Sequence, residues 1–146
     1  MSDAPLTYKG SVYPWHCDQV GHMNVMYYVG KFDEATWNFF ALLGMTRAFF
    51  RDQGRGMAAL EQNIRYKREL LPGDTMEVRT RLTRIEGKKV HFSHSMVNCQ
   101  TGEVAAECDL FAVHVDTALR KSCPFPDEVV ATGRRLMAEA GGGALV

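Results

Sequence analysis

The sequence predicts an α+β domain in which one long central helix is wrapped by a curved five-stranded antiparallel sheet. Apolar residues recur with the spacing of a helix face over residues 24–43, and after residue 57 the pattern changes to the alternation of strands. The chain has 146 residues, of which 46% are hydrophobic, and this suffices for one sizeable core. We therefore expect residues 1–146 to form a single domain, with a core from about residue 7 to 125 and a C-terminal helix and glycine-rich tail over residues 126–146.

The N-terminal part contains a strand, a loop and the strongest helix signal of the chain. Residues 7–14 look like a first strand that Pro14 ends, and residues 15–23 are polar and aromatic, which is typical of a loop. Asn24 is a favourable N-cap, and Gly44 is favourable just after a helix end. Further apolar residues lie on other faces of the helix, so it is expected to be largely buried. The residues on its main apolar face are Val25, Tyr28, Val29, Phe32, Ala35, Phe39 and Leu43.

The remainder of the chain predicts a short helix, four strands and a last helix. Residues 46–53, before Gly54, favour the short helix, and residues 126–140 favour the last one, before glycines 141–143. Four strands joined by three consecutive hairpins predict an antiparallel meander, with the helix segregated to one face of the sheet. The four strands are expected at residues 57–70, 75–86, 89–99 and 103–115, with turns at 72–74, 87–88 and 101–102.

Composition and charge exclude several classes of protein. Lys and Arg total 17 and Asp and Glu also total 17, so nothing indicates a basic surface for nucleic acid or an anionic membrane. A neutral total also favours self-association. No apolar run approaches the ~20 residues that cross a bilayer, and the first residues lack a signal-peptide pattern, so we expect a cytoplasmic protein. The four cysteines contain no C-x-x-C pair and are expected to be reduced thiols.

No metal and no cofactor is predicted. The glycine-rich phosphate loops of nucleotide-binding proteins are missing from the sequence. His91 and His94 are three residues apart on a predicted strand, which places them on opposite faces and argues against a shared metal ion. His16 and Cys17 are adjacent, so their side chains diverge in an extended segment and do not favour a catalytic dyad.

The stretch with the most chemical content lies directly before the long helix. Asp18, Gly21, His22, Asn24 and Tyr27 form the pattern Asp-x-x-Gly-His-x-Asn-x-x-Tyr. Through this pattern the chain resembles the hotdog-fold acyl-CoA thioesterases of the 4-hydroxybenzoyl-CoA thioesterase type. The resemblance implies a hotdog fold and the hydrolysis of a coenzyme A thioester to a free acid and CoA.

Downstream segments extend this resemblance. Tyr-Lys-Arg-Glu-Leu at residues 66–70, followed by Pro-Gly-Asp at 72–74, resembles the strand and turn of the family. Gly-Lys-Lys-Val at residues 87–90 resembles the hairpin that follows. The resemblance therefore covers residues 8 to about 125, which is nearly the whole predicted domain.

The motif has a physical rationale for this chemistry. A carboxylate can attack a thioester or activate a water, and backbone donors can stabilise the oxyanion that forms. Asp18 precedes the helix start on a loop, and this loop can place its carboxylate beside the free N–H groups near Val25. We expect Asp18 to be the base or nucleophile and the Val25 amide to polarise the carbonyl. The alternative for Asp18 is a solvated loop acid, or an acid that stabilises the helix start.

Three neighbours of Asp18 have supporting roles. Gly21 is expected to permit a close turn or a close approach of the backbone to substrate. His22 and Asn24 either hold the loop and cap the helix or donate a hydrogen bond to the carbonyl. A hotdog dehydratase, which would be expected to use a catalytic histidine at His22, is a further possibility.

The resemblance also implies a CoA site shared between subunits of a homodimer or homotetramer. Lys88 and Lys89 match the basic hairpin positions, although Val90 stands where the family often has a hydroxyl residue. Tyr27 belongs to the motif and is a candidate substrate contact. Glu61 lies in the apolar opening of the second strand, where it could serve the pocket of a paired subunit as an acid or base, a water-positioning group or a contact for a cationic substrate. The alternative for Glu61 and the two lysines is an ordinary solvated charge.

The acyl group is less well defined by the sequence. Residues 29–37 resemble thioesterases of carnitine breakdown, which act on betainyl-CoA. A non-catalytic hotdog protein that binds acyl-CoA is the rival from another class. Asp33 and Glu34 on the long helix match a structural acidic pair of the family. The aromatic residues near the loop could line a pocket for an aromatic acyl group, form a box for a quaternary ammonium group, or belong to the core; they are Tyr13, Trp15, Tyr27, Tyr28 and Trp37.

Overall fold

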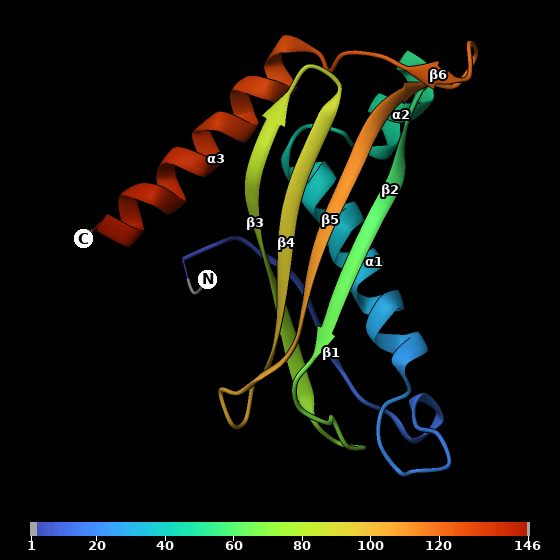
Figure 1. Cartoon of the computed structure of the whole chain (residues 1–146), viewed down its shortest axis with the longest axis vertical. Coiled ribbons are helices and arrows are strands. Elements are labelled where there is room, and N and C mark those ends of the chain that lie inside the picture. Colours follow the sequence, from blue (N-terminus) through green and yellow to red (C-terminus); the bar gives the residue numbers. More distant parts are fainter. Residues whose placement is uncertain (1–2, 146) are drawn as a thin grey trace.

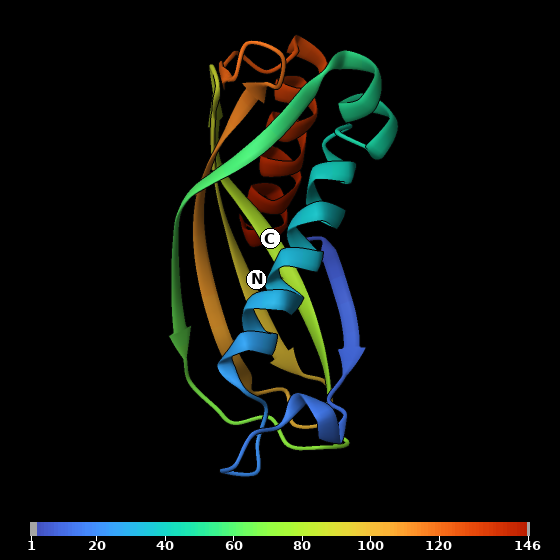
Figure 2. The ribbon, with the colours of Figure 1, turned by 90° about the vertical axis from the view of Figure 1, so that its right-hand side faces the viewer.

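A long helix lies in the hollow of a curved sheet in the computed structural model of the protein, which describes residues 3–145 (Figure 1). Helix α1 (Val25–Leu42) crosses the concave face of this sheet, as the side view shows (Figure 2). The predicted α+β architecture, with one central helix and a curved antiparallel sheet, is confirmed.

Five long strands and one two-residue strand form the sheet. Their order is β1, β3, β4, β5 and β2, and β6 pairs with β5. Every pair is antiparallel. The strands are β1 (Leu6–Ser11), β2 (Arg55–Tyr66), β3 (Thr75–Glu86), β4 (Lys89–Asn98), β5 (Val104–Asp116) and β6 (Lys121–Ser122). The second long strand thus ends at Tyr66 and not at residue 70 as predicted.

The predicted meander of three consecutive hairpins is wrong at its first connection. β2 pairs with β5 and not with β3, so among the four predicted strands only β3, β4 and β5 are joined by consecutive hairpins, and a further short turn pairs β6 with β5. Hairpin loops commonly have about 2–5 residues, whereas residues 67–74 form a longer link that leads from β2 at one edge of the sheet to β3 near the other. This link lies at the same end of the sheet as the loop that precedes α1 (Figure 1).

The position of α1 follows from its two caps and its apolar face. The Asn24 side chain accepts a hydrogen bond from the Met26 amide at 3.0 Å, which starts the helix. Gly44 adopts a φ of 95°, the left-handed conformation that commonly follows a helix end. Phe32 is fully buried, and the ring centroids of Phe39 and Phe92 of β4 lie 5.3 Å apart. Each such buried side chain contributes roughly 1.5–3 kcal/mol to folding.

A chain of polar side chains crosses this apolar core. His94 of β4 contacts Thr36 of α1 through Nε2 at 2.8 Å and Thr80 of β3 through Nδ1 at 2.7 Å. Thr80 in turn lies 2.7 Å from the hydroxyl of Thr7 in β1. The Thr36 hydroxyl donates to the Phe32 carbonyl at 2.9 Å, so Nε2 of His94 donates to Thr36. Burial lowers the pKa of His94 to about 3, so the imidazole is neutral at neutral pH and its Nδ1 accepts from Thr80.

The two other helices frame one end of the sheet. Helix α2 (Arg47–Gln53) matches the prediction and ends at Gly54, whose φ is 61°. Helix α3 (Asp127–Leu145) packs on β3, where Gly133 lies against Leu82. It extends to Leu145 through the glycines of the predicted tail, because glycine lowers helix propensity without excluding helical dihedral angles.

Candidate active site

The Asp18 motif forms a closed loop at the N-terminal end of α1. After the short 3-10 helix η1 (Pro14–His16), the Asp18 amide donates to the His22 carbonyl at 3.2 Å, and the Gly21 amide donates to the Asp18 carbonyl at 3.0 Å. Gly21 adopts a φ of 87°, which residues with a Cβ atom avoid. The expected role of Gly21 in a close turn thus matches its backbone conformation.

Two donors hold the carboxylate of Asp18. The Val20 amide donates to Oδ1 at 3.0 Å, and Nδ2 of Asn24 donates to Oδ2 at 2.8 Å. The hydrogen bond from Asn24, followed by that from Val20, holds the pKa of Asp18 below its usual range, because both stabilise the charged form. Asp18 is therefore ionised at neutral pH, which a general base or a carboxylate nucleophile requires.

The first turn of α1 supplies backbone donors beside this carboxylate. Asn24 both caps the helix through Oδ1 and holds Asp18 through Nδ2, so one side chain aligns the acid with the helix start. Val25 is the first helical residue, and its amide has no acceptor within the helix. The helix dipole adds about half a positive charge at this end. A carbonyl oxygen that becomes negative would be stabilised there.

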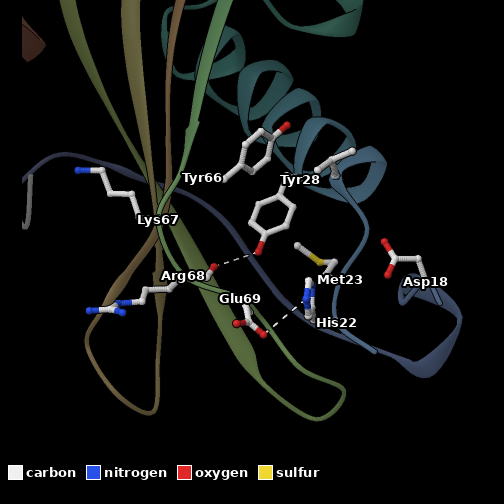
Figure 3. Close-up of a pocket in the computed structure, with 9 residues that line it drawn as sticks. Asp18, His22, Met23, Tyr28, Tyr66, Lys67, Arg68 and Glu69 are labelled. Carbon is white, nitrogen blue, oxygen red and sulfur yellow. Dashed lines mark hydrogen bonds and ion pairs between the residues drawn. The ribbon is translucent and has the colours of Figure 1, made fainter. Parts of the chain in front are cut away.

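A second segment closes the site from the other side. Residues 67–70 follow β2 and are tied to the loop by a hydrogen bond from the Met23 amide to the Leu70 carbonyl at 2.8 Å. A pocket of about 250 Å³ lies between the two segments and the start of α1 (Figure 3). The loop contributes Asp18, His22 and Met23 to its lining, and α1 contributes Val25 and Tyr28. The end of β2 contributes Tyr66, and the second segment contributes residues 67–69.

Two tyrosine rings form one wall of the pocket. The ring centroids of Tyr28 and Tyr66 lie 5.2 Å apart, and the ring planes meet at 88°. Tyr28 is only 4% exposed, and its hydroxyl donates to the Arg68 carbonyl at 3.2 Å. Burial raises the pKa of Tyr28, so its hydroxyl stays protonated at neutral pH.

The basic residues at the pocket are paired with glutamates outside it, whereas its acidic residues line the pocket itself. Outside the pocket, Lys67 pairs with Glu107 of β5 at 2.8 Å. Arg68 pairs with Glu103, the residue before β5, at 3.2 Å. Both cationic side chains point away from the tyrosine rings (Figure 3). Glu69 Oε2 lies 3.5 Å from Nε2 of His22. Asp18 and Glu69 are thus the acidic groups that line the pocket.

The structure brings together five of the residues expected at the site. Asp18, His22 and Val25 line the pocket, while Asn24 and Gly21 hold the loop. The geometry supports the loop-holding and capping role for Asn24.

The other four expected residues lie elsewhere in the chain. Tyr27 lines a separate hollow of about 660 Å³ on another side of α1. Glu61 is exposed on β2, next to a bulge in the pairing with β5. Lys88 and Lys89 are exposed at the β3–β4 hairpin, at the end of the sheet opposite the Asp18 loop (Figure 1).

The second wall of the pocket was not predicted from the sequence. Residues 67–70 were expected to continue a strand, and only the Pro-Gly turn at residues 72–73 indicates that a strand ends nearby. Tyr66 and Glu69 reach the pocket because β2 stops at Tyr66 and the chain then turns toward the loop.

Two features are absent from residues 3–145, the part of the chain that the structure describes. Their His, Cys, Asp and Glu side chains form no group of three or more that could hold a metal ion. None of their helices is both long and apolar enough to cross a membrane.

A curved sheet wrapped around one helix, with an ionised carboxylate and the Val25 amide at the helix start, defines a hotdog-fold thioester hydrolase. The sequence matches the family described as the thioesterase-like superfamily over residues 12–133. The chain belongs to this superfamily, and the predicted hotdog-fold acyl-CoA thioesterase is confirmed.

Relatives and solved structures agree with this assignment. The chain is 29% identical over 131 residues to a betainyl-CoA thioesterase from Pseudomonas aeruginosa, covering 90% of this chain and 82% of that protein. A hypothetical protein from Staphylococcus aureus, solved in complex with CoA, has a TM-score of 0.87 at 18% identity and covers 93% of this chain and 86% of its own. A 1,4-dihydroxy-2-naphthoyl-CoA thioesterase from Synechocystis has a TM-score of 0.77 at 15% identity, over 88% of this chain and 95% of its own. The two structures support the fold.

Proposed function

We propose that the chain hydrolyses betainyl-CoA, the CoA thioester of a small quaternary-ammonium acid, in the pocket beside Asp18. The observation that carries the proposal is the position of an ionised Asp18, held by Asn24 at 2.8 Å, at the start of α1. The acyl group is inferred from the relative of Pseudomonas aeruginosa, whose name gives this substrate.

The residues of the pocket suit each step of thioester hydrolysis. Asp18 either takes a proton from the attacking water or attacks the carbonyl carbon itself. The carbonyl oxygen then takes the negative charge beside the Val25 amide and the positive end of the helix dipole. On the general-base route the carbon–sulfur bond breaks and the CoA thiolate takes up the proton that Asp18 received from the water. On the nucleophilic route the thiolate takes a proton from solvent, and a water then hydrolyses the mixed anhydride of Asp18 and the acyl group, which releases the free acid and restores the carboxylate. His22 and Asn24 keep the loop and its carboxylate in place.

We also propose that the working unit is a homodimer or homotetramer. β2 is an edge of the sheet, and its Leu60 and Tyr66 are 59% and 49% exposed. An edge strand offers unpaired N–H and C=O groups to a second strand. Pairing there would bring Glu61 to an interface, and the distant Lys88 and Lys89 could meet the CoA phosphates of a thioester bound to another copy. Sedimentation equilibrium tests this directly: a fully active species of 16.4 kDa would refute it.

We further propose that the chain forms a single domain and that the protein is cytoplasmic. One apolar core contains residues from Val12 to Val129, which supports a single domain. All four cysteines are free, which suits a reducing compartment such as the cytoplasm.

The proposed function is tested by the release of free thiol from CoA esters. Asp18→Asn should lower kcat/KM for betainyl-CoA by about 100-fold or more, which is the scale of general-base catalysis. Asp52→Asn, a matched change on the exposed surface of α2, should keep the wild-type rate and thermal stability. A wild-type protein that binds CoA esters but releases no thiol would instead be the non-catalytic binding protein. Wild-type activity in folded Asp18→Asn would remove Asp18 from the mechanism.

A further inference from the structure

We propose that Tyr28, Tyr66 and Glu69 form the subsite that recognises the cationic trimethylammonium end of the acyl group. This inference rests on the proposed function and names the residues that would make the pocket selective for a charged acyl group over a neutral one of the same shape.

The two tyrosines have the geometry of an aromatic corner. Their planes are nearly perpendicular at 88° and their centroids lie 5.2 Å apart in an edge-to-face contact, so a cation in the angle between the two rings lies near both. The Tyr28 ring is held in place by burial and by the hydrogen bond of its hydroxyl to the Arg68 carbonyl. Ring faces carry negative charge density and attract cations within about 6 Å of the ring centre.

The charge distribution favours a cation at the same place. Lys67 and Arg68 are close in sequence, but both are paired with glutamates outside the pocket and point away from the rings (Figure 3). Glu69 lines the pocket and has His22 as its neighbour at 3.5 Å. With Asp18 on the opposite side, a bound cation would meet two carboxylates and two aromatic rings.

The short reach of the acyl group selects this pocket over the second aromatic hollow. In a betainyl thioester one methylene group joins the ammonium nitrogen to the carbonyl carbon, so both must lie in the pocket that contains Asp18. The other hollow, with Tyr13 and Trp15, lies on another side of α1. Its lining charges, Lys31 and Glu34, are of opposite sign, so this hollow offers a cation no net negative charge, unlike the pocket lined by Asp18 and Glu69.

The test compares two thioesters of the same shape and different charge. Betainyl-CoA carries the quaternary nitrogen, and 3,3-dimethylbutyryl-CoA has a neutral carbon in its place. Loss of one cation–π contact should lower kcat/KM for betainyl-CoA by about 10-fold in Tyr66→Leu. Tyr66→Phe keeps the ring face and should retain the preference of the wild type, and Glu69→Gln should weaken it.

The neutral thioester distinguishes recognition from structure. Tyr66→Leu and Glu69→Gln should lower kcat/KM for betainyl-CoA more than for 3,3-dimethylbutyryl-CoA, so that the ratio of the two values falls, whereas Tyr13→Leu in the other hollow should leave this ratio at the wild-type value. Equal losses on both thioesters would show that these side chains support the pocket without reading charge, and this would overturn the inference while the proposed function stands. A wild-type enzyme that prefers the neutral thioester would overturn the proposed acyl group itself.

Discussion

Substitutions of Asn24 can separate its two hydrogen bonds. Oδ1 caps α1 by accepting from the Met26 amide at 3.0 Å, and Nδ2 donates to Asp18 at 2.8 Å. Asn24→Ala loses both, whereas Asn24→Ser keeps a capping oxygen and loses the donor to Asp18. We expect Asn24→Ala to lower the free energy of unfolding by about 1 kcal/mol, the usual contribution of an N-cap. Serine is as good a cap as asparagine, so Asn24→Ser should unfold near the wild-type temperature.

The hydrogen bond from Nδ2 of Asn24 to Asp18 should affect activity. The bond from Asn24 contributes most to the lowered pKa of Asp18, so both variants should raise this pKa. A base acts only when deprotonated, and therefore the acid limb of the kcat/KM profile should move to higher pH in both. Thiol release measured across pH gives this shift, and thermal unfolding at neutral pH gives the stability.

A third variant, Asn24→Asp, should raise the pKa of Asp18 further. Asn24→Asp keeps the cap but places a second carboxylate beside Asp18, so its acid limb should move furthest. If Asn24→Ser unfolds as readily as Asn24→Ala, the capping argument is wrong. If the acid limbs of all three variants coincide with that of the wild type, Asn24 does not lower the pKa of Asp18.

Two other positions give predictions of stability. Gly21→Ala should cost about 1–2 kcal/mol because φ is 87°; no atom lies within 4 Å of an added Cβ, so the cost is conformational and Gly21→Asn should recover part of it in urea unfolding. Equal losses in the two variants would contradict this reasoning. Burial lowers the pKa of His94 from 6.5 to about 3, so the unfolded chain binds a proton that the native chain does not. The free energy of unfolding should therefore fall as pH drops from about 6.5 toward 3, by up to about 1.4 kcal/mol for each pH unit, and His94→Gln should lack this component. Parallel curves of stability against pH for the two proteins would count against it.

Local signals predicted the elements well. The bounds of α1 follow from a cap at Asn24, a left-handed glycine at Gly44 and an apolar face between them, all of which are visible in the sequence. The strands β3, β4 and β5 follow from alternation and short turns. In each case neighbours along the chain determine the structure.

The pairing of strands that are distant in the sequence was harder to predict from local signals. Whether the strand that ends at Tyr66 joins β3 or β5 depends on how the whole sheet curves around α1, and its alternation is the same in both arrangements. The position of Glu69 could not be predicted for the same reason, because Glu69 lies beside His22 only when residues 67–70 pass near the start of α1. Asp18 could be selected because its motif is continuous in the sequence from Asp18 to Tyr27, and its hydrogen-bond partners Val20 and Asn24 lie within this same stretch.

The polar chain through the core bears on the accuracy of the catalytic pocket. A helix packed by apolar side chains alone can be displaced along its axis with little change in buried area, whereas the contact between Thr36 and His94 at 2.8 Å allows one axial position. Val25 lies about 16 Å from Thr36 at a rise of 1.5 Å per residue. An anchor in the middle of the sheet thus fixes the depth at which the N-terminal amides emerge, and any mutation that lets α1 shift by a fraction of an ångström would be detected first as slower catalysis and only later as lost stability.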